Sequence, residues 1–290
     1  MTYLLGIDGG GTTCRAALAT ADGTVIARAK SGSANIHTNF AGARENIIDA
    51  ARQAFAEAGI DLARMSEARA VLGLAGANVG THGRQLEATL PFAKSRVETD
   101  AMIALEGAVG GGDGAIAILG TGTAYLGRRD GVARPIGGWG FLIGDHGSGA
   151  QLGRELMERT LLAYDGVGPA SPLTDEILVV FQGDPGNVVS FAATAKPGDF
   201  GGFAPKVFEH AAKGDAVAEA ILGRGQAIIE ASLTRFALGP AKPLSLLAAL
   251  APLYQPPPSE PLRRLIRPPL QDPRGAAVSM ARRFFATVSA

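Results

Sequence analysis

The chain has 290 residues, of which 47% are hydrophobic, and this is enough for two α/β domains that each bury a core. Lysine plus arginine and aspartate plus glutamate number 27 each, so the net charge creates no field that attracts nucleic acid or an anionic membrane surface. The single cysteine, Cys14, excludes an intramolecular disulfide, and the absence of a leader pattern or a spanning apolar run predicts a cytoplasmic protein without a membrane partner.

The first predicted element is a β-hairpin with a glycine-rich turn. Apolar segments at 3–7 and 14–18 are expected to pair as strands, and Asp8 stands at the end of the first one. The turn between them consists of Gly9, Gly10, Gly11, Thr12 and Thr13. Glycine has no Cβ, so its backbone N–H can approach an anion closely. The pattern therefore predicts a phosphate-binding hairpin.

Predicted strands and helices then alternate up to residue 107. The expected strands are 25–29, 68–74 and 95–100, and the expected helices are 41–58, 82–90 and 101–107. A polar loop that follows the third strand ends at Asn35. The alternation of strand and helix from residue 68 onward is typical of a mostly parallel sheet edge. Asp100 would therefore stand at the carboxyl end of a strand, where open α/β sheets bind ligands.

The second half repeats the opening pattern after a glycine-rich linker at 110–114. An apolar strand at 115–119 leads into another turn of glycines and hydroxyls, and 124–128 is the expected return strand. This second turn consists of Gly120, Thr121, Gly122 and Thr123. Two such hairpins, one per domain, are suited to holding one phosphate chain from both sides.

The rest of the chain is mostly helical by its apolar spacing, after a cluster of glycines and polar residues at 137–140 and 144–150. Helices are expected at 152–164, 216–236 and 274–288, and an interrupted helical pattern extends from 173 to 220. Asp215 stands near a helix start. An apolar strand is expected at 244–251.

Four motifs, taken in order, resemble those of the N-acetylglucosamine and glucosamine kinases, which belong with the BadF/BadG/BcrA/BcrD type of ATPase in the actin-like sugar kinase superfamily. The motifs are Gly6–Thr12, Glu98–Ala101, Gly120–Thr123, and Gly137–Gly140 with Gly144 and Asp145. The resemblance covers nearly the whole chain. It implies an α/β, two-domain actin-like ATPase (ribonuclease H-like) fold with a nucleotide and sugar cleft between the domains. The domains would be 1–108, with a C-terminal helix at 274–290 packing back on it, and 109–273 for nucleotide binding and dimerisation.

The same resemblance implies a role for each motif residue. The two glycine turns would bind the phosphates of ATP, Asp8 would hold Mg²⁺ through water, and Asp100 would be the general base for the sugar 6-hydroxyl. Substrate contacts would come from Asn35, Gly138, Trp139 and Asp145. Ala248 and Ala249 would lie at the adenosine end.

Four positions depart from the family pattern. Ala248 and Ala249 stand where such kinases usually carry a pair of glycines, so their methyl groups are expected to crowd the nucleotide. His146 replaces a frequent glutamate beside the sugar site, and Ala124 stands where animal N-acetylglucosamine kinases place an asparagine.

Each candidate residue also has a structural interpretation. Asp100 is placed where a helix cap would stand, and Asn35 and Asp145 have the setting of turn residues. Trp139, between glycines, is interpreted first as a packing wedge that holds its loop and second as a stacking platform. The four histidines show no helical pairing, which argues against a zinc site.

We therefore expect an ATP- and Mg²⁺-dependent kinase that phosphorylates the 6-hydroxyl of N-acetylglucosamine or glucosamine. The resemblance also implies a homodimer, because members of the family commonly dimerise. One alternative is an activator-type ATPase with an iron–sulfur cluster, against which the single Cys14 argues. Another is a sugar or nucleotide sensor without turnover, which Ala248 and Ala249 would favour. The sequence leaves open whether the 2-amino group of the sugar must be acetylated.

Overall fold

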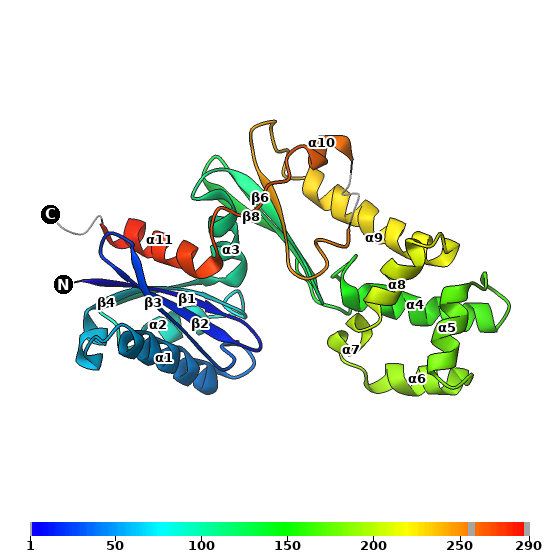
Figure 1. The fold of residues 1–290 in the computed structure, drawn as a ribbon, viewed down its shortest axis with the longest axis horizontal. Coiled ribbons are helices and arrows are strands. Elements are labelled where there is room, and N and C mark those ends of the chain that lie inside the picture. The colour runs from blue at the N-terminus through cyan, green and yellow to red at the C-terminus, as the bar shows by residue number, and fades with distance from the viewer. Residues whose placement is uncertain (1, 255–258, 287–290) are drawn as a thin grey trace. The chain divides into compact units, whose positions relative to one another are not determined.

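The structure is a computed structural model that describes residues 2–254 and 259–286. The chain divides into two compact units, the first formed by Met1–Gly112 and Pro269–Ala290 and the second by Asp113–Pro268 (Figure 1). Each unit contains one β-sheet with helices against it. Within the described ranges, no helix has the length and apolar character needed to cross a membrane.

The first unit contains a five-stranded sheet in the order β3-β2-β1-β4-β5. Its strands are β1 Tyr3–Gly9, β2 Cys14–Thr20, β3 Val25–Ser31, β4 Ala68–Leu74 and β5 Lys94–Thr99. The first three pair antiparallel, whereas β4 and β5 run parallel to β1. The carboxyl ends of β1, β4 and β5 therefore share one edge of the sheet.

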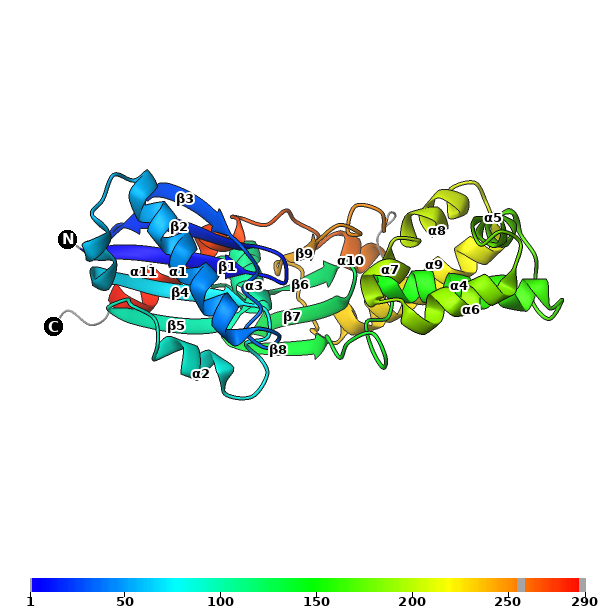
Figure 2. The same ribbon diagram turned by 90° about the horizontal axis from the view of Figure 1, so that it is seen from below.

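Helices cover both faces of this sheet. They are α1 Phe40–Glu57, the 3₁₀ helix η1 Leu62–Glu67, α2 His82–Glu87, α3 Asp100–Val109 and α11 Pro273–Ala286. Successive side chains of β1 point to opposite faces of the sheet, so Leu5 lies on the face packed by α1 and Leu4 on the face packed by α3 and α11. Figure 2 shows α1 and α2 in front of this sheet with α3 and α11 behind it.

Gly6 explains how closely α11 approaches the middle of β1. A Cβ at Gly6 would lie 2.7 Å from the backbone nitrogen of Val278 and would also clash with the carbonyl oxygen of Arg274. Only glycine leaves room for that helix at this point. The last described helix of the chain is thereby joined to its first strand.

The second unit contains a four-stranded sheet in the order β8-β7-β6-β9. Its strands are β6 Gly114–Leu119, β7 Thr123–Arg129, β8 Val132–Gly137 and β9 Leu244–Leu247, and β9 runs parallel to β6. The helices are α4 Gly149–Tyr164, α5 Pro172–Val180, α6 Pro185–Thr194, α7 Pro197–Gly201, α8 Ala204–Ala211, α9 Ala216–Thr234 and α10 Glu260–Arg263. A buried core joins β6 to α4 and α9.

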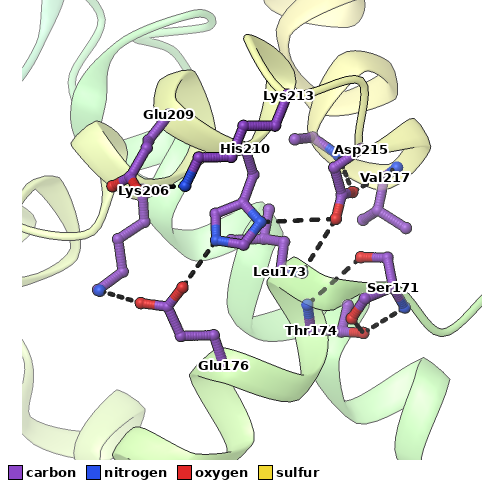
Figure 3. Close-up of polar contacts among 11 residues, drawn as sticks. Ser171, Leu173, Thr174, Glu176, Lys206, Glu209, His210, Lys213, Asp215 and Val217 are labelled. Carbon is purple, nitrogen blue, oxygen red and sulfur yellow. Dashed lines mark hydrogen bonds and ion pairs between the residues drawn. The ribbon is translucent and has the colours of Figure 1, made fainter.

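A polar network joins α5, α8 and α9 within the second unit (Figure 3). Asp215 caps α9 by accepting bonds from the backbone N–H groups of Val217 and Ala218, each at 3.0 Å, which confirms its predicted place at a helix start. His210 Nε2 lies 2.7 Å from Glu176 Oε2, and its Nδ1 lies 3.7 Å from Asp215 Oδ2. The network therefore fixes the start of α9 to α8 and α5.

Most predicted elements are present, and the end of the helix predicted at 274–288 lies outside the described residues. Three of the differences affect the second sheet or a helix of the first unit. The strand predicted at 244–251 ends at Leu247, because the backbone of Ala248 turns to a positive φ of 72°. Strand β8 was not predicted; it contains Pro135, which is tolerated because β8 lies at the sheet edge. The helix predicted at 82–90 ends at Glu87.

Candidate active site

The first glycine turn leaves backbone donors exposed at the end of β1. Gly10 N donates to the Thr13 carbonyl at 2.9 Å, which closes the turn. The N–H groups of Gly11 and Thr12 donate to no residue that the structure describes, and both residues are exposed. Two free N–H groups in one turn are suited to an anion. The phosphate-binding role of the turn stays a prediction.

Asp8 lies at the base of this turn, paired with an arginine that the sequence analysis did not single out. The strand register places Asp8 directly opposite Arg15, and Arg15 Nη1 is 3.5 Å from Asp8 Oδ2. Burial raises the pKa of Asp8; Arg15 opposes that shift and the nearby Asp100 carboxylate adds to it. The parallel register of β1, β4 and β5 places Asp8 and Asp100 at the same edge of the sheet.

Asp100 begins α3 directly after β5, at the shared carboxyl edge of the sheet. Its Oδ1 accepts a bond of 2.8 Å from Ala101 N. The residue is exposed, yet protein atoms displace part of the water around the carboxylate and this raises the pKa of Asp100, while the bond from Ala101 opposes the shift. A raised pKa makes a carboxylate a stronger base.

Asn35 stands on a loop that crosses the ends of β1 and β4. The loop is held there because Ala34 N donates to the Gly10 carbonyl at 2.9 Å and Ile36 N to the Ala75 carbonyl at 3.1 Å. Asn35 Oδ1 accepts bonds from the N–H groups of His37 and Thr38, at 3.0 and 3.2 Å. The oxygen therefore performs the turn role that was one of its two interpretations. The Nδ2 amide group donates to no described residue and remains available to a ligand.

The second glycine turn joins β6 to β7 and rests on the first turn of α4. Gly120 N donates to the Gly122 carbonyl at 3.0 Å. The carbonyls of Gly120 and Thr121 accept bonds from Gly149 N and Ala150 N, at 2.9 and 3.2 Å. Helix α4 thus holds the turn through N–H groups that a helix leaves without internal partners. The N–H groups of Thr121 and Gly122 donate to no residue in the described ranges.

Asp145 lies against this second turn. A Cβ at Gly122 would come within 2.8 Å of Asp145 Oδ2, so a larger residue there would displace the carboxylate from its present place. Asp145 itself has a positive φ of 56°, an uncommon conformation for a residue with a side chain. Burial raises the pKa of Asp145, while backbone groups of Thr123 and Gly140 oppose the shift. The carboxylate is held beside the turn rather than in solvent.

Trp139 is not a packing wedge, and that interpretation was wrong. Its side chain is 75% exposed. The physical reason is the backbone on either side: Gly138 and Gly140 have positive φ values of 73° and 84° and turn the tryptophan outward. An exposed indole between two such glycines leaves the stacking role open.

Ala248 and Ala249 follow β9 and are both exposed. Ala248 has a φ of 72°, in the left-handed region where glycine is favoured. A Cβ at Gly120 would lie 3.5 Å from the Cβ of Ala248, so the segment after β9 approaches the second glycine turn. Alanine at this position therefore strains the backbone itself.

Each unit therefore gathers one set of predicted residues. The first unit brings together the first glycine turn, Asp8, Asn35 and Asp100, and the second brings together the second glycine turn, Asp145 and Ala248. Arg15 was missed, although counting outward from a four-residue turn would have placed it opposite Asp8. Gln151, whose amide holds the loop before Asp145, was also missed, and its sequence context carries no signal for it.

The carboxylates of the first unit fit Mg²⁺ rather than a metal held by protein alone. No group of three or more potential ligand side chains occurs among the described residues. Mg²⁺ commonly takes one or two carboxylates and completes its shell with water and substrate phosphates. Asp8, at the base of the first glycine turn with its exposed N–H groups, is a single carboxylate of that kind.

Comparisons with known proteins identify the family of the chain. A model of the BadF/BadG/BcrA/BcrD ATPase family matches residues 5–237. A glucosamine kinase of Vibrio cholerae is 37% identical over 283 residues, which are 97% of this chain and 96% of that protein. The crystal structure of a candidate N-acetylglucosamine kinase from Chromobacterium violaceum is 31% identical, with a TM-score of 0.85 over 97% of this chain and 99% of that one. A ROK hexokinase from Thermus thermophilus, 16% identical, shares the fold with a TM-score of 0.52 over 97% and 98% of the two chains.

Proposed function

Since the chain belongs to the BadF/BadG/BcrA/BcrD ATPase family and has its two-domain actin-like fold, we propose that it is an ATP-dependent aminosugar kinase. The acceptor is glucosamine or N-acetylglucosamine, and the product is its 6-phosphate. The match to a glucosamine kinase over nearly the full length of both chains carries this proposal. The match to the family model, over residues 5–237, spans both glycine turns, Asp100 and Asp145.

In the proposed reaction, the oxygen of the sugar 6-hydroxyl attacks the γ-phosphorus of ATP, and the bond from that phosphorus to the bridging oxygen of ADP breaks. Asp100 accepts the hydroxyl proton. Phosphoryl transfer depends on positioning and charge stabilisation more than on covalent catalysis, so one base and a set of N–H donors suffice. The free N–H groups of the two glycine turns support this, since they are suited to phosphate oxygens.

Mg²⁺ would be held by Asp8, through water, and would neutralise part of the charge on the phosphates. The protein's own contribution at this point is Arg15, whose guanidinium lies 3.5 Å from Asp8 and helps to keep that carboxylate ionised. Asn35 would donate its free amide group to a sugar hydroxyl, and Asp145 would accept a hydroxyl hydrogen. Gly138 and Trp139 would line the sugar, and Ala248 with Ala249 the adenosine.

The activator-type ATPase is not favoured. Such proteins hold an iron–sulfur cluster through cysteine thiolates. The single cysteine here, Cys14, is buried within the sheet of the first unit. A thiol in that position cannot reach a cluster at the protein surface. We further propose that the enzyme is a homodimer and acts in the cytoplasm.

A coupled assay of ADP release tests the proposal. It uses the purified full chain with glucosamine, N-acetylglucosamine, glucose and no sugar, each with and without Mg²⁺. Release that requires both an aminosugar and Mg²⁺ is expected, with a 6-phosphate identified by mass spectrometry. Sugar-independent release would favour an ATPase, and no release with either aminosugar would contradict the kinase. Melting temperatures with the two aminosugars then rank their binding.

A further inference from the structure

The loop between β8 and Asp145 exposes an unusual amount of apolar surface. We call residues 138–144 the Trp139 loop. Trp139, Leu142 and Ile143 are 75%, 87% and 81% exposed. Large apolar side chains that gather on one exposed loop mark an interaction site more often than a neutral surface. The loop leads directly into Asp145, so a ligand of that carboxylate lies within reach of the loop.

One side chain of the loop points the other way and anchors it. The ring of Phe141 packs on Phe200 of α7, with 5.4 Å between the ring centroids. This contact fixes the middle of the loop to the second unit. The residues on either side of Phe141 are thereby left to face solvent.

Gln151, in the first turn of α4, holds the backbone of the loop on both sides of Leu142 and Ile143. Its Nε2 donates to the Phe141 carbonyl at 2.6 Å and to the Gly144 carbonyl at 2.9 Å. The loop closes on itself because Gly144 N donates to the Gly140 carbonyl at 2.8 Å. A single amide thus satisfies two carbonyls of a segment that belongs to no strand or helix. Loss of its donors leaves both carbonyls without that partner.

The helix that carries Gln151 is itself well fixed. The side chain of Ser148 caps α4 and accepts a bond of 3.2 Å from Gln151 N. The N–H groups of Gly149 and Ala150, which lie between Ser148 and Gln151 in the chain, hold the second glycine turn. Gln151 therefore connects the Trp139 loop to the same helix start that holds the predicted phosphate-binding turn.

We propose that Gln151 is a positioning residue for the sugar: it holds the Trp139 loop in the conformation in which Trp139 covers the apolar C–H face of the sugar ring while Asp145 binds a hydroxyl. This inference rests on the proposed aminosugar kinase. A sugar ring presents C–H groups on one face and hydroxyls at its edge, and an aromatic ring beside a carboxylate is complementary to both. Gln151 acts through the loop and does not itself touch the sugar.

The only tryptophan of the chain is Trp139, so intrinsic tryptophan fluorescence reports on this loop alone. The experiment compares the wild type with Gln151→Glu, which keeps the size and removes the donors, and with Gln151→Met, which is apolar and of similar length. The matched control is Gln85→Met, because Gln85 is exposed on α2 and its amide bonds to no described residue. Glucosamine and N-acetylglucosamine are the probes, added without ATP for the emission spectra and with ATP for kinetics.

Both Gln151 variants are expected to raise the KM for the sugar about tenfold, with the KM for ATP within about twofold of the wild type, as two lost hydrogen bonds would do. The change in emission that saturating sugar causes in the wild type is expected to shrink. Gly144→Ala gives an independent arm, since its Cβ would lie 2.9 Å from the Cβ of Trp139 and would displace the loop from its other end. It is expected to raise the same KM.

An unchanged sugar KM and an unchanged emission response in both Gln151 variants would overturn the inference. Equal losses for sugar and ATP, together with a lower melting temperature, would also overturn it, because they indicate a purely structural residue. A wild type that phosphorylates neither aminosugar overturns the proposed function and this inference with it. A wild type that phosphorylates an aminosugar, with variants that match it, overturns the role of Gln151 alone.

Discussion

The hydroxyl of Thr99, and not the carboxylate of Asp100, caps helix α3. Thr99 Oγ1 accepts a bond of 3.1 Å from Met102 N, which is the bond that defines a helix cap. Asp100 follows as the first helical residue, and its carboxylate accepts bonds from the backbone N–H groups of Ala101 and of Asp100 itself, not from the third residue of the helix. The structural role that an aspartate often has at a strand-to-helix junction is filled by its neighbour. The carboxylate of Asp100 is therefore available for chemistry.

Asp100→Asn should abolish sugar phosphorylation while ATP still binds. The amide keeps the shape of the side chain but cannot accept the hydroxyl proton, so kcat should fall by a factor on the order of 10²–10⁴. ADP release in the presence of aminosugar measures kcat, and the shift of melting temperature with ATP and Mg²⁺ measures binding. Retention of transfer by this variant would remove Asp100 from the role of base.

Thr99→Val is the matched control for that change. It removes the cap and should lower the free energy of unfolding by about 1 kcal/mol. Because it leaves the carboxylate in place, its kcat should fall far less than that of Asp100→Asn. Equal losses of kcat in the two variants would indicate that catalysis depends on the backbone position of the start of α3 and not on the Asp100 carboxylate.

Ala248→Gly should stabilise the protein, against the usual direction for a glycine substitution. Ala248 has a φ of 72°, a conformation that costs a residue with a Cβ about 1 kcal/mol more than glycine. The melting temperature should rise by about 2–4 °C. The KM for ATP should fall as well, if the methyl group crowds the adenosine.

Ala249→Gly separates strain from a general effect of glycine. Ala249 is equally exposed, and a positive φ is not found for it. Glycine at position 249 relieves no backbone strain and increases the conformational entropy of the unfolded chain. The variant should therefore be slightly less stable than the wild type. An increase in melting temperature for Ala249→Gly similar to that for Ala248→Gly would contradict the strain argument.

Asp215→Ala should lower the free energy of unfolding by about 2–4 kcal/mol, because it removes the cap of α9 and the bond of 2.9 Å that Asp215 Oδ2 accepts from Leu173 N (Figure 3). Urea unfolding at neutral pH measures the change. Glu219→Ala, an exposed acidic residue of the same helix turn, should change stability by less than about 0.5 kcal/mol.

The effect of Asp215 should also depend on pH with a definite sign. Burial opposes ionisation, but bonds from Ala218, Leu173 and Val217 outweigh it, so the pKa of Asp215 lies below its ordinary value of 3.8. A lowered pKa in the folded state gives stability that is complete above the ordinary value and is lost as the pH falls through the folded one. The difference between wild type and Asp215→Ala should be constant from pH 7 to about pH 5 and shrink below about pH 4. A difference that grows in acid would contradict this.

The sequence predicted the features of each unit that depend on residues close together in the chain. The hairpin of β1 and β2, the position of Asp100 after β5 and the cap at Asp215 follow from apolar periodicity and turn residues, and the structure contains all three. The orientation of Trp139 depends instead on the φ angles of Gly138 and Gly140, which sequence does not determine because glycine accepts either sign. The bonds of Gln151 join an amide to two carbonyls across a loop, and no spacing rule predicts such contacts.

Cys14 should not react with thiol reagents in the folded protein. The thiol is fully buried in β2, and burial raises its pKa to about 12, so almost no thiolate exists at pH 8. Iodoacetamide labelling followed by mass spectrometry should find the cysteine unmodified without denaturant and fully modified in guanidinium chloride. Rapid labelling of the native protein would contradict this and would indicate that β2 opens.

Asn35→Asp should separate the two roles of Asn35, because aspartate keeps the oxygen and loses the amide group. The bonds from His37 N and Thr38 N persist, so the turn and the melting temperature should be nearly unchanged. The donor that we assign to a sugar hydroxyl is lost, so the KM for the aminosugar should rise about tenfold while the KM for ATP stays the same. Asn35→Ala loses both roles and should lower stability as well. If Asn35→Asp binds sugar as well as the wild type does, the residue has only the turn role, and the sugar contact must be assigned to another donor.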